Sequence, residues 1–107
     1  MKRGEIRWYT FKAPDKRRPV LILTRNSAIG FLNSVTIAPI TTTVRDIPTE
    51  VYLSPADGML TECAVNLDNI QTVHKAKIGP LITRLSSERM HEVKQAISFA
   101  LEFDAFF

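Results

Sequence analysis

The chain has a single cysteine, Cys63, among its 107 residues. One cysteine cannot close an internal disulfide, so the small disulfide-stabilised folds of secreted proteins are excluded. A reducing cytoplasm is the expected compartment. No histidine or basic cluster lies close to Cys63 in the sequence, so we expect a small buried hydrophobic residue at this position and not a nucleophile.

Long apolar runs are also missing. None approaches the roughly 18 residues that a membrane-spanning helix needs. The first residues, Met1-Lys2-Arg3, are followed by polar residues and not by the apolar centre of a signal peptide. We therefore expect a cytoplasmic protein with no export signal and no membrane partner.

Metal-ligating residues are few and scattered. His74 and His91 are the two histidines, and no group of Asp, Glu, His or Cys has the spacing of a metal site. Histidine is a frequent general base. The positions of these two have no catalytic signature, and we expect both to be structural or exposed. The sequence predicts no metal ion and no cofactor.

What the chain does have is an ordinary globular composition and an uneven charge. With 45% hydrophobic and 23% charged residues, its 107 residues predict a single domain over 1–107. Residues 1–18 hold seven Lys and Arg against two acidic side chains, whereas residues 19–107 hold seven basic and nine acidic ones. This asymmetry favours a polyanionic partner at one end of the molecule. A solvated basic loop would give the same pattern.

Short apolar and β-branched runs predict strands over most of the chain. The expected strands are 5–11, 20–24, 35–40, 49–53, 63–67, 70–73 and 81–85. Apolar residues then recur at helical spacing, which predicts an amphipathic helix over 87–102 with Ser86 as its N-cap. Pro39 cannot donate a ladder hydrogen bond, so its strand is expected at a sheet edge or at a bulge. The pattern indicates a mainly β fold, a small and strongly bent antiparallel sheet with one C-terminal helix.

Groups that can hold a phosphate stand at the ends of two expected strands. Arg17 and Arg18 are predicted to precede the second strand, and the threonines 41–43 to follow the third. A guanidinium makes paired, charge-assisted hydrogen bonds to phosphate oxygens, and a hydroxyl can donate to them without charge. On adjacent strands, these side chains would suit a site that binds and cleaves a phosphodiester. The structural alternatives are surface arginines and a polar strand end.

Four motifs in order and register resemble the MazF/PemK/Kid toxins over nearly the whole chain. They are Gly4-Glu5-Ile6, Arg18-Pro19-Val20-Leu21, Ala38-Pro39-Ile40-Thr41-Thr42 and Asp68-Asn69-Ile70-Gln71-Thr72. The resemblance implies an SH3-like small barrel of the PemK/CcdB type with a C-terminal helix. It also implies a homodimeric, metal-independent endoribonuclease toxin of a type II toxin–antitoxin system, which a cognate antitoxin neutralises.

The implied reaction is sequence-specific cleavage of single-stranded RNA by attack of the 2′-hydroxyl, which leaves a 2′,3′-cyclic phosphate and inhibits translation and growth. The RNA attacked, messenger, transfer or ribosomal, stays open. By the same resemblance, Arg18 and Thr41 are the expected catalytic residues. Arg17 and Thr42 are expected to bind substrate beside them. Glu5 stands where the family often has an acid near the site, although an ion pair with a neighbouring arginine is the simpler expectation.

The fourth motif departs from the family. Asp68 matches an acidic position, but the family's arginine two residues before it is Asn66 here, and the following positions hold Asn69 and Gln71. A mechanism with that arginine as general acid is therefore doubtful. We expect a reduced catalytic site of Arg18 and Thr41. The side chains expected to contact bases are Asn66, Asp68, Asn69 and Gln71, since amide groups suit the Watson–Crick edges of bases.

Two other functions of the same fold stay open. One is a CcdB-like gyrase poison, which would not need the Arg18 and Thr41 pair. The other is a non-catalytic SH3-like module that binds RNA or protein, and whose binding through basic loops would weaken steeply with salt.

Overall fold

The computed structural model describes residues 1–12 and 16–103. Its strands are β1 (Glu5–Phe11), β2 (Lys16–Ile22), β3 (Ser34–Thr41), β4 (Glu50–Leu53), β5 (Cys63–Asn66), β6 (Gln71–His74) and β7 (Ile78–Arg84). Its helices are α1 (Asn26–Ile29) and α2 (Ser87–Ala100), with short 3-10 helices η1 (Pro55–Asp57), η2 (Leu67–Asn69) and η3 (Lys75–Lys77). All seven expected strands and the C-terminal helix are confirmed, most with bounds shifted by a few residues.

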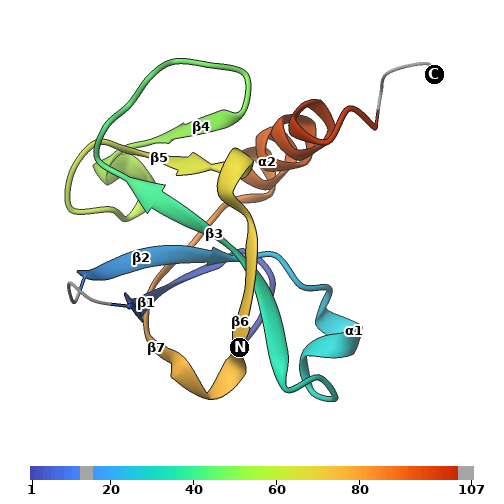
Figure 1. Ribbon diagram of the computed structural model, residues 1–107. Coiled ribbons are helices and arrows are strands. Elements are labelled where there is room, and N and C mark those ends of the chain that lie inside the picture. The colour runs from blue at the N-terminus through green and yellow to red at the C-terminus, as the bar shows by residue number, and fades with distance from the viewer. Residues whose placement is uncertain (13–15, 104–107) are drawn as a thin grey trace.

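The strands form one antiparallel sheet in the order β4-β5-β3-β2-β1-β7, and β6 also pairs with β3. In Figure 1, β3 crosses the molecule and connects β4, β5 and α2 above to β1, β2 and β7 below. The predicted mainly β fold with a C-terminal helix is confirmed. Within the described chain β4 and β7 do not pair, so the bent sheet is not closed into a barrel.

The beginning of β2 differs from the prediction. Lys12 to Arg18 is predicted as a basic loop, but β2 begins at Lys16, and both arginines lie inside the strand. The reason is pairing with β1, which places Arg17 opposite Thr10 and Arg18 opposite Tyr9. The tip of this predicted loop, 13–15, lies outside the described residues. The two arginines are therefore held on an extended hairpin and not on a loop.

Pro39 does not mark an edge strand, because β3 lies between β2 on one side and β5 and β6 on the other. The N–H of Leu23 donates to the carbonyl of Thr36 at 2.9 Å, so the backbone polar groups of Thr36 point toward the β2 side of β3. These groups alternate along a strand, so the backbone nitrogen of Pro39 points to the other side of β3. There the β6 pairing stops at Ile37 and the β5 pairing starts at Ile40. The backbone N–H that Pro39 lacks would therefore point into the gap between β6 and β5, where no partner strand needs it.

Two apolar clusters pack on the sheet. The larger one joins the sheet to α2 and includes Ile6, Leu21, Leu53 and Val93, while the smaller one includes Ile37 and is covered by Tyr9 and other half-buried residues. The Ser86 hydroxyl accepts the Arg89 N–H at 3.1 Å, which confirms the predicted cap. Val93 and Ala96 are the buried residues of α2, and they place its apolar face on the larger cluster.

Cys63 is buried, as predicted, and burial raises the pKa of its thiol. Phe103, near the C-terminus, is 73% exposed, while Phe106 and Phe107 lie outside the described residues. Within residues 1–12 and 16–103 no helix is long and apolar enough to cross a membrane.

Candidate functional site

The candidate site is a pocket of about 410 Å³ at the point where β2 and β3 separate. The two strands pair as far as Val20 and Pro39, and no further. Beyond this pair the strands diverge, and the pocket opens between them. Four of the predicted site residues line it, namely Arg17, Arg18, Thr41 and Thr42.

Arg18 and Thr41 belong to corresponding positions on the two strands. If the register of Val20 with Pro39 continued by two residues, Arg18 would lie opposite Thr41. Residues opposite each other on paired strands share a face of the sheet. The pairing ends before these two residues, but both of their side chains line the pocket that opens where the strands separate.

The Thr41 hydroxyl has a fixed orientation. Its oxygen accepts the backbone N–H of Thr43 at 3.1 Å, the kind of local turn that a polar strand end often makes. A hydroxyl has one hydrogen to donate in addition to its acceptor sites. The contact therefore leaves the Thr41 hydrogen free for a phosphate oxygen. Thr43, for which no role is predicted, contributes through its backbone.

Arg17 is held by an aromatic ring. Its guanidinium carbon lies 4.4 Å from the centre of the Trp8 ring, and both residues line the pocket. Trp8 and Tyr9 are consecutive in β1 and therefore point to opposite faces of the strand. Tyr9 packs edge-to-face on Phe11 with ring centres 4.8 Å apart, on the side of the smaller cluster. The exposed arginine is thus preorganised, because stacking on an indole restrains a guanidinium.

The opposite wall of the pocket comes from the segment 58–62 between η1 and β5. Met59, Leu60 and Thr61 line the pocket, together with Ile82 of β7. Leu60 is 91% exposed. The pocket is therefore lined by apolar side chains together with arginines and hydroxyls.

Glu5 does not line this pocket. Its carboxylate is 2% exposed and accepts Arg7 Nε at 2.8 Å and Arg84 Nε at 3.4 Å. Burial alone would raise the pKa of Glu5, but the hydrogen bond from Arg7 and the backbone at Lys2 outweigh it and lower the pKa. The simpler expectation, an ion pair with a neighbouring arginine, is confirmed. The geometry gives Glu5 no open path to a substrate in the pocket.

The polar residues of the fourth motif lie apart from the pocket, between β5 and β6. Asn66 Oδ1 accepts the N–H of Asp68 at 3.0 Å and so caps η2. Asp68 Oδ2 accepts the hydroxyl of the buried Thr49 at 2.6 Å. Asn69 and Gln71 are exposed, with one bond of 3.4 Å from Gln71 Nε2 to the Asn69 carbonyl. Two of the four side chains therefore stabilise the turn, and two are free to contact a ligand.

The histidines lie outside the pocket. His74 is exposed, and its Nδ1 accepts the N–H of Ala76 at 3.2 Å at the start of η3. His91 is exposed on α2. Across the described positions no three His, Cys, Asp or Glu side chains gather as metal ligands.

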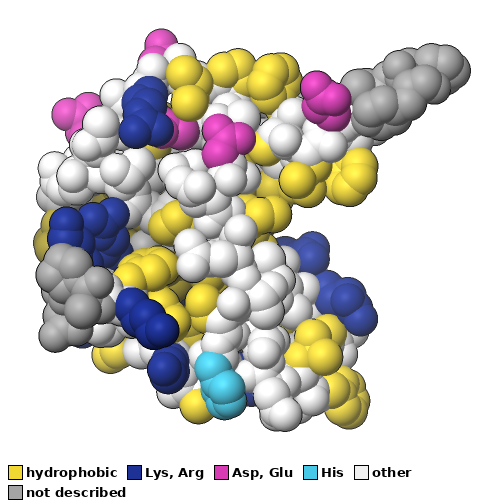
Figure 2. Space-filling view, in the orientation of Figure 1, with side chains coloured by type: hydrophobic (Ala, Val, Ile, Leu, Met, Phe, Trp, Pro, Cys, Tyr) yellow, Lys and Arg dark blue, Asp and Glu magenta, His cyan; other side chains and the backbone are white. Residues whose placement is uncertain are grey.

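Charge is separated over the surface. In the view of Figure 2, Lys and Arg side chains gather mainly on the lower half, over β1, β2 and β7. Asp and Glu side chains gather on the upper half, around β4 and α2. The uneven charge of the sequence thus becomes a basic side of the molecule, and β2, which carries Arg17 and Arg18, lies in that half.

A family model ties this geometry to known proteins. The model of the PemK-like, MazF-like toxin of type II toxin–antitoxin systems matches residues 2–101. The chain belongs to this family.

Relatives agree over nearly the full chain. Probable endoribonuclease MazF5 of Mycobacterium tuberculosis is 38% identical over 101 residues, 94% of this chain and 92% of the relative. Endoribonuclease MazF3 of the same species is 41% identical over 90 residues, 84% of this chain and 87% of the relative.

Solved structures agree as well. Mycobacterium tuberculosis toxin MazF-mt6 matches with a TM-score of 0.84 at 37% identity, covering 96% of this chain and 99% of that one. An endoribonuclease in complex with its cognate antitoxin, from Mycobacterial species, matches with a TM-score of 0.86 at 28% identity, covering 95% of each chain.

Sequence reasoning did not anticipate the second wall of the pocket. Met59, Leu60 and Thr61 follow a Pro and Gly turn and look like ordinary loop residues. One signal was available, because Met59 and Leu60 are apolar residues that stand between the turn glycine Gly58 and the polar Thr61, outside any predicted strand or helix. The stacking of Arg17 on Trp8 was also missed, since the hairpin register that brings them together was predicted as a loop.

Proposed function

We propose that this MazF-family toxin is a sequence-specific, metal-independent endoribonuclease. It cleaves single-stranded RNA by attack of the 2′-hydroxyl on the adjacent phosphate. The observation that carries the proposal is that Arg18 and Thr41, from two neighbouring strands, line one pocket on the basic side of the molecule. The chain's membership in a family of toxins, with relatives named endoribonucleases, supports the same reaction.

The proposed chemistry forms a bond from O2′ to phosphorus and breaks the bond from phosphorus to O5′. The proton leaves the 2′-hydroxyl, and one is delivered to the departing 5′ oxygen. Negative charge builds on the phosphate oxygens in between, where preorganised donors stabilise it most. Arg18 supplies a charged donor fork, and the free hydrogen of Thr41 supplies a neutral donor. The products are a 2′,3′-cyclic phosphate and a 5′-hydroxyl.

Substrate binding extends from the pocket along the basic side. Arg17 and Thr42 line the same pocket and are assigned to the flanking phosphates. Asn69 and Gln71 are assigned to base edges, because their amides are exposed. Asn66 and Asp68 support this turn by the bonds described above, and Glu5 acts indirectly by holding Arg7. The RNA class attacked is left to experiment.

A long RNA of known sequence tests the proposal. The purified protein is incubated with it in EDTA, and the fragment ends are sequenced. We expect discrete cuts with 2′,3′-cyclic phosphate ends, lost in Arg18→Ala and kept in Arg25→Ala, an exposed arginine far from the pocket. Intact RNA from folded protein would overturn the proposal. That result would favour a gyrase poison or a binding module without catalytic activity.

We also propose a homodimer with a cognate antitoxin as its protein partner. Phe99 and Phe103 at the end of α2 are 58% and 73% exposed, an apolar surface that a partner would cover. The solved relative in complex with its antitoxin supports a protein ligand, and an acidic tail would complement the basic side. Light scattering of the purified chain should give twice the mass of 12.1 kDa. A monomer at micromolar concentration would contradict the dimer.

A further inference from the structure

The lining of the pocket is more apolar than phosphate binding requires. Trp8, Ile40, Met59 and Leu60 line it, although a phosphate needs only donors at the rim. Aromatic, guanidinium and aliphatic surfaces are what unstacked nucleobases pack against, because every base has an apolar face. Leu60 stands out, since a side chain that is 91% exposed gives nothing to the core.

We propose that this pocket binds the nucleobase next to the cleaved phosphate, between the stacked Trp8–Arg17 pair and Leu60. The inference rests on the proposed function and deepens it. The base is selected by its shape and stacking, with the hydroxyls of Thr42 and Thr61 as the nearby polar groups. Leu60 is then a specificity-determining residue for the reaction.

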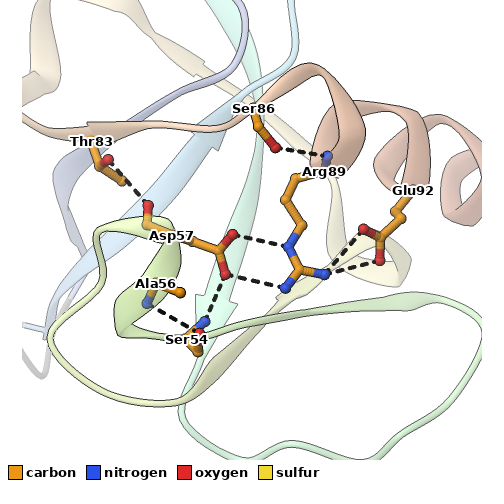
Figure 3. Close-up of polar contacts among 7 residues, drawn as sticks. All are labelled: Ser54, Ala56, Asp57, Thr83, Ser86, Arg89 and Glu92. Atoms are coloured by element: carbon orange, nitrogen blue, oxygen red, sulfur yellow. Dashed lines mark hydrogen bonds and ion pairs between the residues drawn. The ribbon is translucent and has the colours of Figure 1, made fainter.

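The segment that carries Leu60 is anchored at its start, as Figure 3 shows. The Asp57 carboxylate accepts Arg89 Nε at 3.0 Å and Nη2 at 3.3 Å, and also the Ser54 N–H at 2.9 Å. Burial alone would raise the pKa of Asp57, but the bonds from Arg89 and Ser54 lower it, so the carboxylate stays ionised at neutral pH.

A second contact fixes the same point to β7. The Thr83 hydroxyl donates to the Asp57 carbonyl at 3.2 Å. The next residue, Gly58, has φ of 94°, and a Cβ on it would lie 2.3 Å from Thr83 Oγ1. Only glycine fits there. The segment 58–62 is therefore attached to α2 and β7 at its first residues. The Asp57–Arg89 ion pair positions this wall of the pocket.

The first test removes the proposed base contact. Leu60→Ala is compared with Leu81→Ala, the same substitution at a 40% exposed position of β7 that does not line the pocket. Cut sites on a long RNA are sequenced for both. We expect Leu60→Ala to relax the preference at one position beside the cut and to leave the other positions unchanged. Leu81→Ala should keep the wild-type preference at every position.

A second test uses short RNA substrates in which one nucleotide beside the cut lacks its base. Loss of the correct base should raise KM roughly tenfold in the wild-type protein, within the range of one base stacked on an aromatic group. In Leu60→Ala the same loss should raise KM by less. Arg89→Met should likewise raise KM for the intact substrate more than for the abasic one, which a general loss of stability would not do.

The outcomes separate this inference from the proposed function. If the wild-type protein cuts no RNA, the proposed function fails. If it cuts, and Leu60→Ala keeps the wild-type preference and the full abasic effect, the nucleobase pocket is wrong while the ribonuclease stands. Equal KM changes for intact and abasic substrates in Arg89→Met would refute the positioning role of Asp57 and Arg89.

Discussion

Two polar motifs lie along β3, one at its C-terminal end and one beside its middle, and they are organised differently. At the C-terminal end of β3, Arg18 and Thr41 face a pocket, and the Thr41 hydroxyl keeps a free hydrogen. Beside the middle of β3, where the chain passes from β5 to β6, Asn66 is bonded to the backbone of η2 and Asp68 to the hydroxyl of Thr49. Polar side chains in a motif thus divide into those that fold the chain and those left over for a ligand.

The largest expected effect comes from the pocket end. Arg18→Ala should lower kcat by on the order of 10²–10³, because it removes a charged donor to the transition state. Single-turnover cleavage of a short RNA measures it, with circular dichroism to verify the fold. Arg17→Ala should act mainly on KM, since stacking on Trp8 assigns that guanidinium to binding. An Arg18→Ala protein that turns over within threefold of the wild type would remove this arginine from the mechanism.

A smaller loss is expected at the threonine. Thr41→Val keeps the shape and removes the hydroxyl, and we expect roughly a tenfold fall in kcat, as for one neutral hydrogen bond to a developing charge of about 1.4 kcal/mol. Thr41→Ser keeps the donor and should retain most of the activity. If the valine and serine variants are equally impaired, then packing and not the hydroxyl accounts for the role of Thr41.

Substitutions in the turn between β5 and β6 should change the stability of the protein and not the rate of cleavage. Asp68→Ala leaves the hydroxyl of Thr49, itself 8% exposed, without its acceptor, at a cost of about 1–2 kcal/mol in the free energy of unfolding. Urea titration measures this cost, and kcat should change less than twofold. Asn69→Ala is the matched variant, with KM raised and stability kept. A large fall in kcat for Asp68→Ala would instead show that Asp68 belongs to the catalytic site, and the two motifs would then not differ in role.

The smallest effect is an acid dependence of stability. The pKa of Asp57 and that of Glu5 are both lowered in the folded protein. Their contributions are therefore complete above the unfolded carboxyl pKa of about 4 and are lost as pH falls through the lower folded values. Urea titrations between pH 7 and 3 should show falling stability below about pH 4. Arg89→Met should flatten part of that fall, and an unchanged profile would mean that Asp57 gains nothing from Arg89.

Much of the fold is predictable from local sequence. The period of the apolar residues changes from strand to helix near Ser86, and the cap forms there as expected. The strand bounds fail where pairing overrides local signals. Proline and a run of charges predict a loop at 12–18, yet pairing with β1 extends β2 back to Lys16. Pro39 predicts an edge or a bulge, and the structure places it in the middle of the sheet, at a gap between two partner strands.

By itself the sequence determined the strand and helix composition, the basic N-terminal end, and the presence of Arg18 and Thr41 in motifs of one family. These follow from residue type and spacing along the chain. Only the tertiary structure decided that Leu60 and Trp8 line one pocket, that Arg84 joins Arg7 on Glu5 and that Arg89 anchors the wall. These residues are between 32 and 79 positions apart in the sequence. Such contacts depend on strand register and on where strands separate, which no local pattern encodes.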